Sequence, residues 1–198
     1  MKEMKRFPRI YLLTILFSLS ILLSCSDNSA GPDEGPSGMG QASFTIAGDI
    51  TGQKTGIAEF YSFSAFGVHT WSISIFDIGP STYELDFTII DTSPISRPVN
   101  GIYTLDTNLA PTIGFKAIYS NIIGNNVTEY TPFISAVFCP EITGDGGTLT
   151  IENSTDDRVS GKFEFTASNF DFDESGNCVV LGAVTVKGEF DAKKTSLN

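Results

Sequence analysis

The residues that most often carry catalysis are scarce in this chain. His69 is its one histidine, and no serine lies in a Gly-x-Ser-x-Gly motif. A Ser-His-Asp triad needs a histidine beside an activated serine, so no triad is predicted. Alternation of apolar and polar residues puts His69 on the strand face of Trp71 and Ile73, at the rim of a core. We therefore predict a structural role for His69, and no catalytic, cofactor-binding or metal-ligating residue.

One acidic segment partly resembles a calcium-binding loop. Asp171, Asp173 and Ser175 offer oxygen ligands at the first, third and fifth positions, and Gly176 follows at the sixth. The last position of such a loop is Gly182 here instead of a bidentate glutamate, and no flanking helices are expected. The same residue types favour a tight turn. We expect Asp171–Gly176 to cap a hairpin, with calcium binding as the alternative.

Two carboxylates have a spacing that glycoside hydrolysis would permit. Glu84 and Asp86 share one face of a predicted strand, which places them roughly 7 Å apart. Glycosidases need two carboxylates about 5–10 Å apart in a cleft. Any strand with a polar face offers such a pair, so we expect Glu84 and Asp86 to lie on a solvated face.

The N-terminus has the layout of a secretory signal peptide. A short basic segment precedes an apolar run, Ile10–Leu23. The run is shorter than the roughly 20 residues of a membrane-spanning helix. It leads into Leu22-Leu23-Ser24-Cys25, which resembles the lipobox of bacterial lipoproteins: an aliphatic residue, a tolerant position, a small residue and a cysteine. The resemblance implies cleavage before Cys25, diacylglycerol on its sulfur and acylation of the new amine.

The residues after Cys25 predict a flexible tether and a location at the outer membrane. Residues 26–41 are rich in Gly, Pro, Ser and acids, with almost nothing to bury. Such a chain spans on the order of 20–24 Å. Ser26 stands where an aspartate would signal retention at the inner membrane, so we expect the outer membrane. Asp27, Asp33 and Glu34 resemble export signals of Bacteroidota surface lipoproteins, and the periplasmic and cell-surface faces both stay open.

With Cys25 assigned to lipid, two cysteines remain, Cys139 and Cys178. An even number in an oxidising compartment predicts one disulfide, and two buried free thiols are the alternative. Zinc is not expected, because the two cysteines and the single histidine lack the close spacing of a zinc site.

The charge of the chain excludes one class of partner. The net charge is −11, and removal of residues 1–24 takes away four bases and one acid, which leaves about −14. Nucleic-acid binding rests on clustered Lys and Arg, so it is not expected.

The dominant sequence period is two, which predicts strands with one dry and one wet face. We predict about ten short strands in one antiparallel domain, either a sandwich or a barrel, with no internal repeat. The boundaries are a signal peptide over 1–24, the lipidated cysteine and tether over 25–41, the all-β domain over 42–192 and a tail over 193–198. Strands are expected around 44–46, 58–66, 70–76, 83–89, 101–105, 114–119, 133–138, 147–152, 163–167 and 184–186.

The C-terminal third carries a second resemblance. Gly147–Ile151 reads Gly-Thr-Leu-Thr-Ile, Ser160–Phe165 reads Ser-Gly-Lys-Phe-Glu-Phe, and Val184–Phe190 closes with Val-Thr-Val-Lys-Gly-Glu-Phe. This succession resembles the ending of uncharacterised Bacteroidota envelope lipoproteins, although Gly188 follows Val184 one position sooner than in that pattern. The resemblance implies a fold and a location in the cell envelope, and it implies no activity.

Three functions are compatible with these observations. The first is a non-enzymatic envelope module, anchored through Cys25, that binds a glycan or an envelope protein or serves a structural role. The second is a lipocalin-like carrier of an apolar ligand, which requires an interior cavity. The third is a hydrolase that uses carboxylates alone, which requires a cleft holding a carboxylate of raised pKa.

Overall fold

The computed structural model describes residues 38–65, 68–77, 81–91, 97–105, 114–132, 139, 142 and 144–195. These residues form an all-β domain, as the period of two predicts. Ten strands make one sheet in the order β5-β8-β9-β10-β1-β2-β3-β4-β6-β7, which is sandwich-like and does not close into a barrel. The strands are β1 Gln41–Gly48, β2 Gly52–Ala65, β3 Val68–Phe76, β4 Tyr83–Asp91, β5 Gly101–Thr104, β6 Gly114–Ile123, β7 Asn126–Tyr130, β8 Gly146–Ser154, β9 Arg158–Phe172 and β10 Cys178–Lys194.

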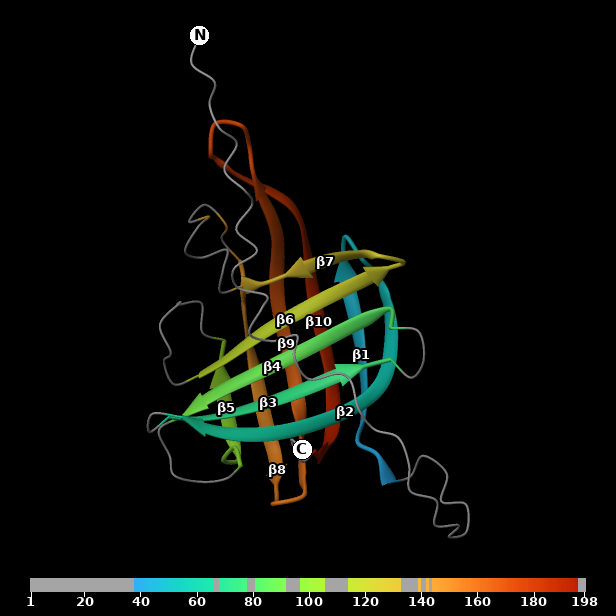
Figure 1. Ribbon diagram of the computed structural model, residues 1–198, viewed down its shortest axis with the longest axis vertical. Helices are drawn as coiled ribbons and strands as arrows, with labels where there is room; N and C mark the ends of the chain where they lie inside the picture. Colours follow the sequence, from blue (N-terminus) through green and yellow to red (C-terminus); the bar gives the residue numbers. More distant parts are fainter. Residues whose placement is uncertain are drawn as a thin grey trace. The chain divides into compact units, whose positions relative to one another are not determined.

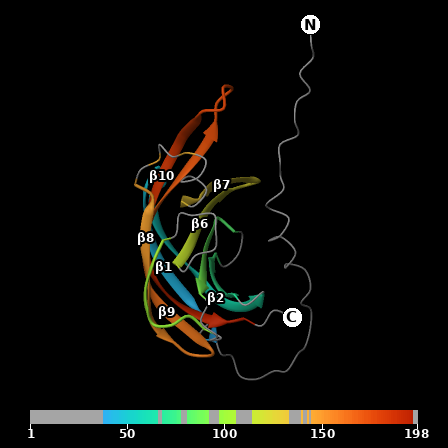
Figure 2. The same cartoon turned by 90° about the vertical axis from the view of Figure 1, so that its left-hand side faces the viewer.

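The sheet folds over at β2 to make two facing layers. The first residues of β2 pair with β1 as far as Ile57, and the rest of the strand pairs with β3 from Ile57 onward. The strands β8, β9, β10 and β1 therefore form one layer, and β3, β4, β6 and β7 cross it as a second layer (Figure 1). Figure 2 shows the two layers side on. The fold lets both layers bury one face against each other.

Aromatic rings fill the space between the layers. The ring of Phe87 on β4 lies within 6.3 Å, centroid to centroid, of four rings from β6, β9 and β10: Phe115, Phe163, Phe165 and Phe190. Tyr83 packs edge-on against Phe44. Its hydroxyl lies against Gly56, where a Cβ would come within 2.2 Å of the oxygen, so the packing requires glycine there. Alternate residues of the predicted strands supply this core, as their period implies.

The structure differs from the sequence prediction in strand lengths. β2, β9 and β10 contain 14, 15 and 17 residues, because each continues past the part that shows clean alternation. The strand β7 was not predicted, since its five residues, Asn-Val-Thr-Glu-Tyr, carry few apolar side chains. The predicted strand at 133–138 lies outside the described residues. β10 runs to Lys194, and its last two residues pair with β2 in parallel.

The hairpin of β9 and β10 extends beyond the rest of the sheet (Figures 1 and 2). β8 pairs with β9 only up to Thr166, and β1 pairs with β10 only from Val184. Past these residues no third strand joins the ladder in the described part of the chain. At the base of the projection the amide of Thr131 donates to the carbonyl of Ser168, and the Asn169 side chain donates to the carbonyl of Glu129. We call residues Phe170–Gly182 the β9–β10 arm. Among the described residues, no helix has the length and apolar character needed to cross a membrane.

Candidate functional site

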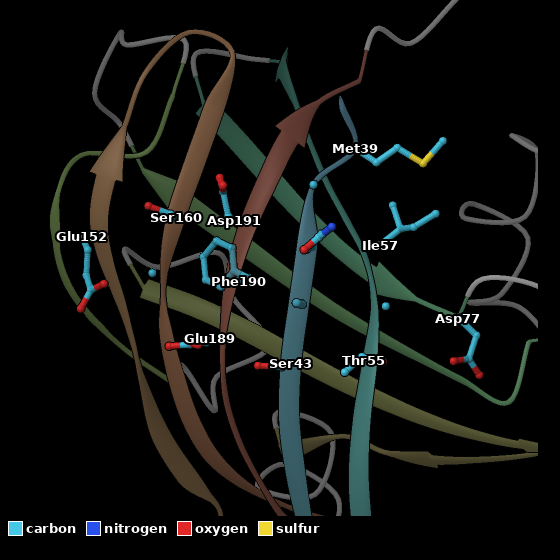
Figure 3. Close-up of a pocket in the computed structure, with 15 residues that line it drawn as sticks. Met39, Ser43, Thr55, Ile57, Asp77, Glu152, Ser160, Glu189, Phe190 and Asp191 are labelled. Atoms are coloured by element: carbon cyan, nitrogen blue, oxygen red, sulfur yellow. The ribbon is translucent and has the colours of Figure 1, made fainter. Parts of the chain in front are cut away.

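A shallow groove of about 710 Å³, lined by polar side chains together with Met39 and Ile57, crosses the outer face of β9, β10, β1 and β2 (Figure 3). A second groove of about 500 Å³ adjoins it and shares Ser43 and Glu189. Polar and acidic side chains that line the first groove are Gln41, Ser43, Thr55, Asp77, Glu152, Ser160, Glu189 and Asp191.

Three oxygen-bearing side chains form a row through the middle of the groove. Ser43 on β1 is the register partner of Glu189 on β10 and of Thr55 on β2. Neighbouring strands lie about 4.8 Å apart, so the three side chains stand at regular intervals across three strands. Figure 3 shows them in line. The carboxylate of Glu189 accepts no hydrogen bond from any residue in the described part of the chain. Lys162, its register partner on β9, is bonded to Glu152 and lies close enough for its charge to interact with that of Glu189.

Ion pairs fix the other charged side chains around this row. Lys162 Nζ lies 2.7 Å from Glu152 Oε1, and Lys187 Nζ lies 2.7 Å from Glu164 Oε2. Arg158 reaches Asp191 with an N···O distance of 3.0 Å. All three pairs are exposed, so each contributes little to stability. Their effect on the groove is to pair its flanking charges while Glu189 stays without a hydrogen bond.

The right-hand end of the groove in Figure 3 is formed by Asp77, between β3 and β4. Its Oδ2 accepts hydrogen bonds from the amide and the hydroxyl of Thr82, the amide at 3.1 Å. One of its oxygens is thus committed to holding the turn.

The predicted carboxylate pair, Glu84 and Asp86, lies on β4 and lines neither groove. Asp86 accepts a hydrogen bond of 2.5 Å from the Ser74 hydroxyl on β3. Burial raises the pKa of Asp86 to about 6, the Ser74 hydrogen bond opposes that rise and the charge of Glu84 adds to it. The expectation of a fully solvated face therefore holds for exposed Glu84 and is wrong for Asp86.

The segment Asp171–Gly176 caps the β9–β10 hairpin, as the preferred interpretation of its sequence predicts: Asp171 lies at the end of β9, and residues 173–177 form the turn. The carboxylate of Asp173 accepts hydrogen bonds from the amides of Ser175 and Asn177 and from the Asn177 side chain. These hydrogen bonds lower the pKa of Asp173. Asp171 accepts a bond from the amide of Phe172. Both carboxylates that a calcium ion would need are thus turned to backbone donors.

Cys139 and Cys178 form a disulfide, with their Cα atoms 5.4 Å apart. The prediction of a bridge is confirmed, and the alternative of two free thiols is wrong. The bridge ties the arm, near its tip, to the segment that follows β7. Cys25, the predicted lipidation site, lies outside the described residues.

His69 is the second residue of β3 and is half-buried at the end of the inward-facing series that contains Trp71 and Ile73. Its position agrees with a place at the rim of the core. No group of three or more His, Cys, Asp or Glu residues suited to a metal ion occurs among the described residues.

The groove was not predicted from the sequence, although the polar faces of two strands that form it were. The strands β9 and β10 were predicted with a wet face that carries Lys162, Glu164 and Lys187. The row of Glu189, Ser43 and Thr55 depends on strands that are far apart in the chain, and only their register brings these residues together.

Comparisons with known proteins leave the chain without an assigned relative. No protein-family model matches it, and neither a curated protein nor a solved structure is found to be similar.

Proposed function

We propose that this chain is an envelope lipoprotein, held at the outer membrane by lipid on Cys25, whose β domain binds a glycan non-enzymatically in the outer-face groove. The anchor rests on the sequence Leu22-Leu23-Ser24-Cys25 at the end of the apolar run. The binding role rests on one observation above all. Glu189 lines both adjoining grooves, in register with the hydroxyl-bearing Ser43 and Thr55, and its carboxylate accepts no hydrogen bond from the described residues.

The chemistry of the groove fits a ligand rich in hydrogen-bond donors. Carboxylates accept only, and the hydroxyls of Ser43 and Thr55 accept as readily as they donate. Sugar hydroxyls satisfy such a row, and an amino sugar adds a charge-assisted bond to Glu189, which is about twice as strong as a neutral one. No exposed aromatic ring lines the groove, so hydrogen bonds rather than stacking must supply the affinity.

The packing of the interior favours surface binding over carriage of an apolar ligand. A carrier needs an unfilled interior, and here the rings around Phe87 occupy the space between the layers. The side chains that line the two grooves are mostly polar and lie on the outer face of the sheet. The ligand of this domain is therefore proposed to be polar.

Metabolic labelling with a fatty acid tests the anchor. The full-length chain is expected to incorporate label, and the Cys25→Ala variant is expected to accumulate as an unlabelled precursor. Label in the variant would disprove the assignment of the anchor without affecting the groove.

Calorimetric titration tests the groove, with glucosamine hexasaccharide as the probe and its N-acetylated form as the uncharged comparison. Glu189→Gln is expected to weaken binding of the charged probe about ten- to hundredfold, because a hydrogen bond to a charged group contributes about 1.5–3 kcal/mol. Glu174→Gln, a change of equal charge at the arm tip, is the matched control and should leave the affinity unchanged. Equal losses in both variants would show non-specific attraction to an acidic protein.

A further inference from the structure

The β9–β10 arm exposes a concentration of apolar side chains that the fold does not use. Phe172, Val179, Val180 and Leu181 are 47%, 42%, 51% and 61% exposed. Apolar residues scattered singly over a surface are ordinary, whereas a contiguous exposed group marks an interaction site. Here Phe172 and Val180 share one face of a short hairpin, Leu181 lies at the bulge beside Val180, and Val179 lies on the opposite face. Among the described residues, no third strand pairs with this part of the hairpin.

A β-bulge produces this display. In the body of the sheet, even-numbered residues of β10 such as Val184 and Val186 face the core. The register shifts between Val180 and Gly182, so that Val180 lies opposite Phe170. The shift moves Val180 to the outer side, on the face that Phe170 and Phe172 share. Bulges typically redirect a side chain in this way.

The arm is held in one conformation before any partner arrives. At its tip, the amide of Asp173 donates to the carbonyl of Asn177, and the amide of Gly176 donates to the carbonyl of Asp173. The disulfide from Cys178 to Cys139 braces the arm beside this turn. A preformed surface loses little conformational entropy on binding, which favours affinity.

The charge of the arm selects the chemistry of the partner. Between Thr166 and Val186 the chain has no Lys, Arg or His, and it has three acids: Asp171, Asp173 and Glu174. We propose that the β9–β10 arm docks into a partner protein that presents an apolar groove bordered by basic residues. This interaction surface is additional to the glycan groove and does not depend on the identity of its ligand.

The same charge pattern disfavours two other occupants. A second copy would bring two arms of like charge together, in a chain whose net charge is −11. A bilayer would have to admit the acidic tip first, because Asp173 and Glu174 lie beyond the apolar side chains. Charged groups in hydrocarbon are costly.

Site-specific photocrosslinking in the envelope of cells that produce the full-length chain tests the proposal. A benzophenone side chain replaces Leu181 in the arm or, as the control, Ile123, which is 69% exposed in the β6–β7 hairpin. The Leu181 probe is expected to give a discrete adduct with another protein, mapped to a segment that combines apolar residues with Lys or Arg. The Ile123 probe should give none.

The second measurement tests whether the charge of the arm contributes to docking. Adduct yield at Leu181 is expected to fall about fivefold when the Asp171→Lys and Glu174→Lys changes are combined, and to fall similarly in high salt, which screens rim charges. A dimer-sized adduct would assign the arm to a second copy. Crosslinking to lipid in phosphatidylethanolamine–phosphatidylglycerol vesicles would assign it to a membrane. Either the dimer-sized adduct or the lipid crosslink would overturn the proposal. Equal adducts at Ile123 and Leu181, or no adduct at Leu181, would overturn it too.

Discussion

The body of the β9–β10 hairpin and its arm use the same two strands for opposite purposes. In the body, Phe163, Phe165 and Val186 are buried against the second layer, and the opposite face is polar. In the arm, Phe172 and Val180 are half-exposed, and no strand of the second layer covers them in the part of the chain that the structure describes. The difference shows that apolar side chains on one hairpin can serve stability in one part and be left for recognition in the other.

The largest loss of stability is expected from a substitution in the most densely packed part of the core. Phe87→Ala should lower the free energy of unfolding by about 3–5 kcal/mol, because it removes a fully buried ring and leaves a cavity among four others. Phe172→Ala, the matched change in the arm, should cost less than about 1 kcal/mol, since its side chain is 47% exposed and Phe170 is its one aromatic neighbour among the described residues. Urea denaturation of both variants measures the contrast. Similar losses would mean that the arm is part of the core.

The second-largest loss of stability is expected from removal of the disulfide. Replacement of Cys139 and Cys178 by serine should lower the free energy of unfolding by about 2–4 kcal/mol, the range for bridges that close loops of this size. Amide hydrogen exchange should rise first around Cys178 and stay slow around Val186. Uniformly faster exchange would show that the bridge stabilises the whole domain rather than the arm.

A smaller change in the free energy of unfolding is expected from replacement of Asp86, which lies on the outer side of the second layer. Burial raises its pKa from 3.8 to about 6, so the folded protein holds the proton more tightly than the unfolded chain does. The free energy of unfolding should therefore fall as pH rises through this interval, and Asp86→Asn should recover about 1–3 kcal/mol at pH 7. Glu84→Gln should recover less than Asp86→Asn, because the charge of Glu84 is the smallest of the named causes of the raised pKa. A pH slope that persists in Asp86→Asn would refute the assignment.

The smallest effect on stability is expected from the arm itself. Val180→Ser combined with Leu181→Ser should change the free energy of unfolding by no more than about 0.5 kcal/mol, as for most exposed positions. Val186→Ser, on the buried part of the same strand, should lower it by at least about 2 kcal/mol. Thermal unfolding of these variants provides the comparison. A large loss in the arm variant would argue that its apolar residues support the fold.

Strand faces could be predicted from the sequence because their information is local. Trp71, Ile73 and Ile75 alternate with Thr70, Ser72 and Ser74, and all three apolar residues are fully buried as expected. The prediction of a wet opposite face is wrong for this strand, because Thr70 and Ser72 are buried as well. The disulfide could be predicted as well, from the parity of the cysteines. The burial of Asp86 could not, since it depends on Ser74 across the strand pair β3–β4 and on what surrounds them.

The sequence by itself determined the all-β class, the apolar sets of residues that face the core, and the motif around Cys25 on which the proposed anchor rests. Tertiary structure decided which outward residues meet. Glu189, Ser43 and Thr55 lie on three strands and share a groove only because β1 pairs with both β10 and β2. A period of two fixes the face of a residue, whereas its neighbours depend on long-range register, which no short stretch of sequence encodes. The same holds for the bulge at Leu181, which turned an ordinary alternating strand into an exposed apolar arm.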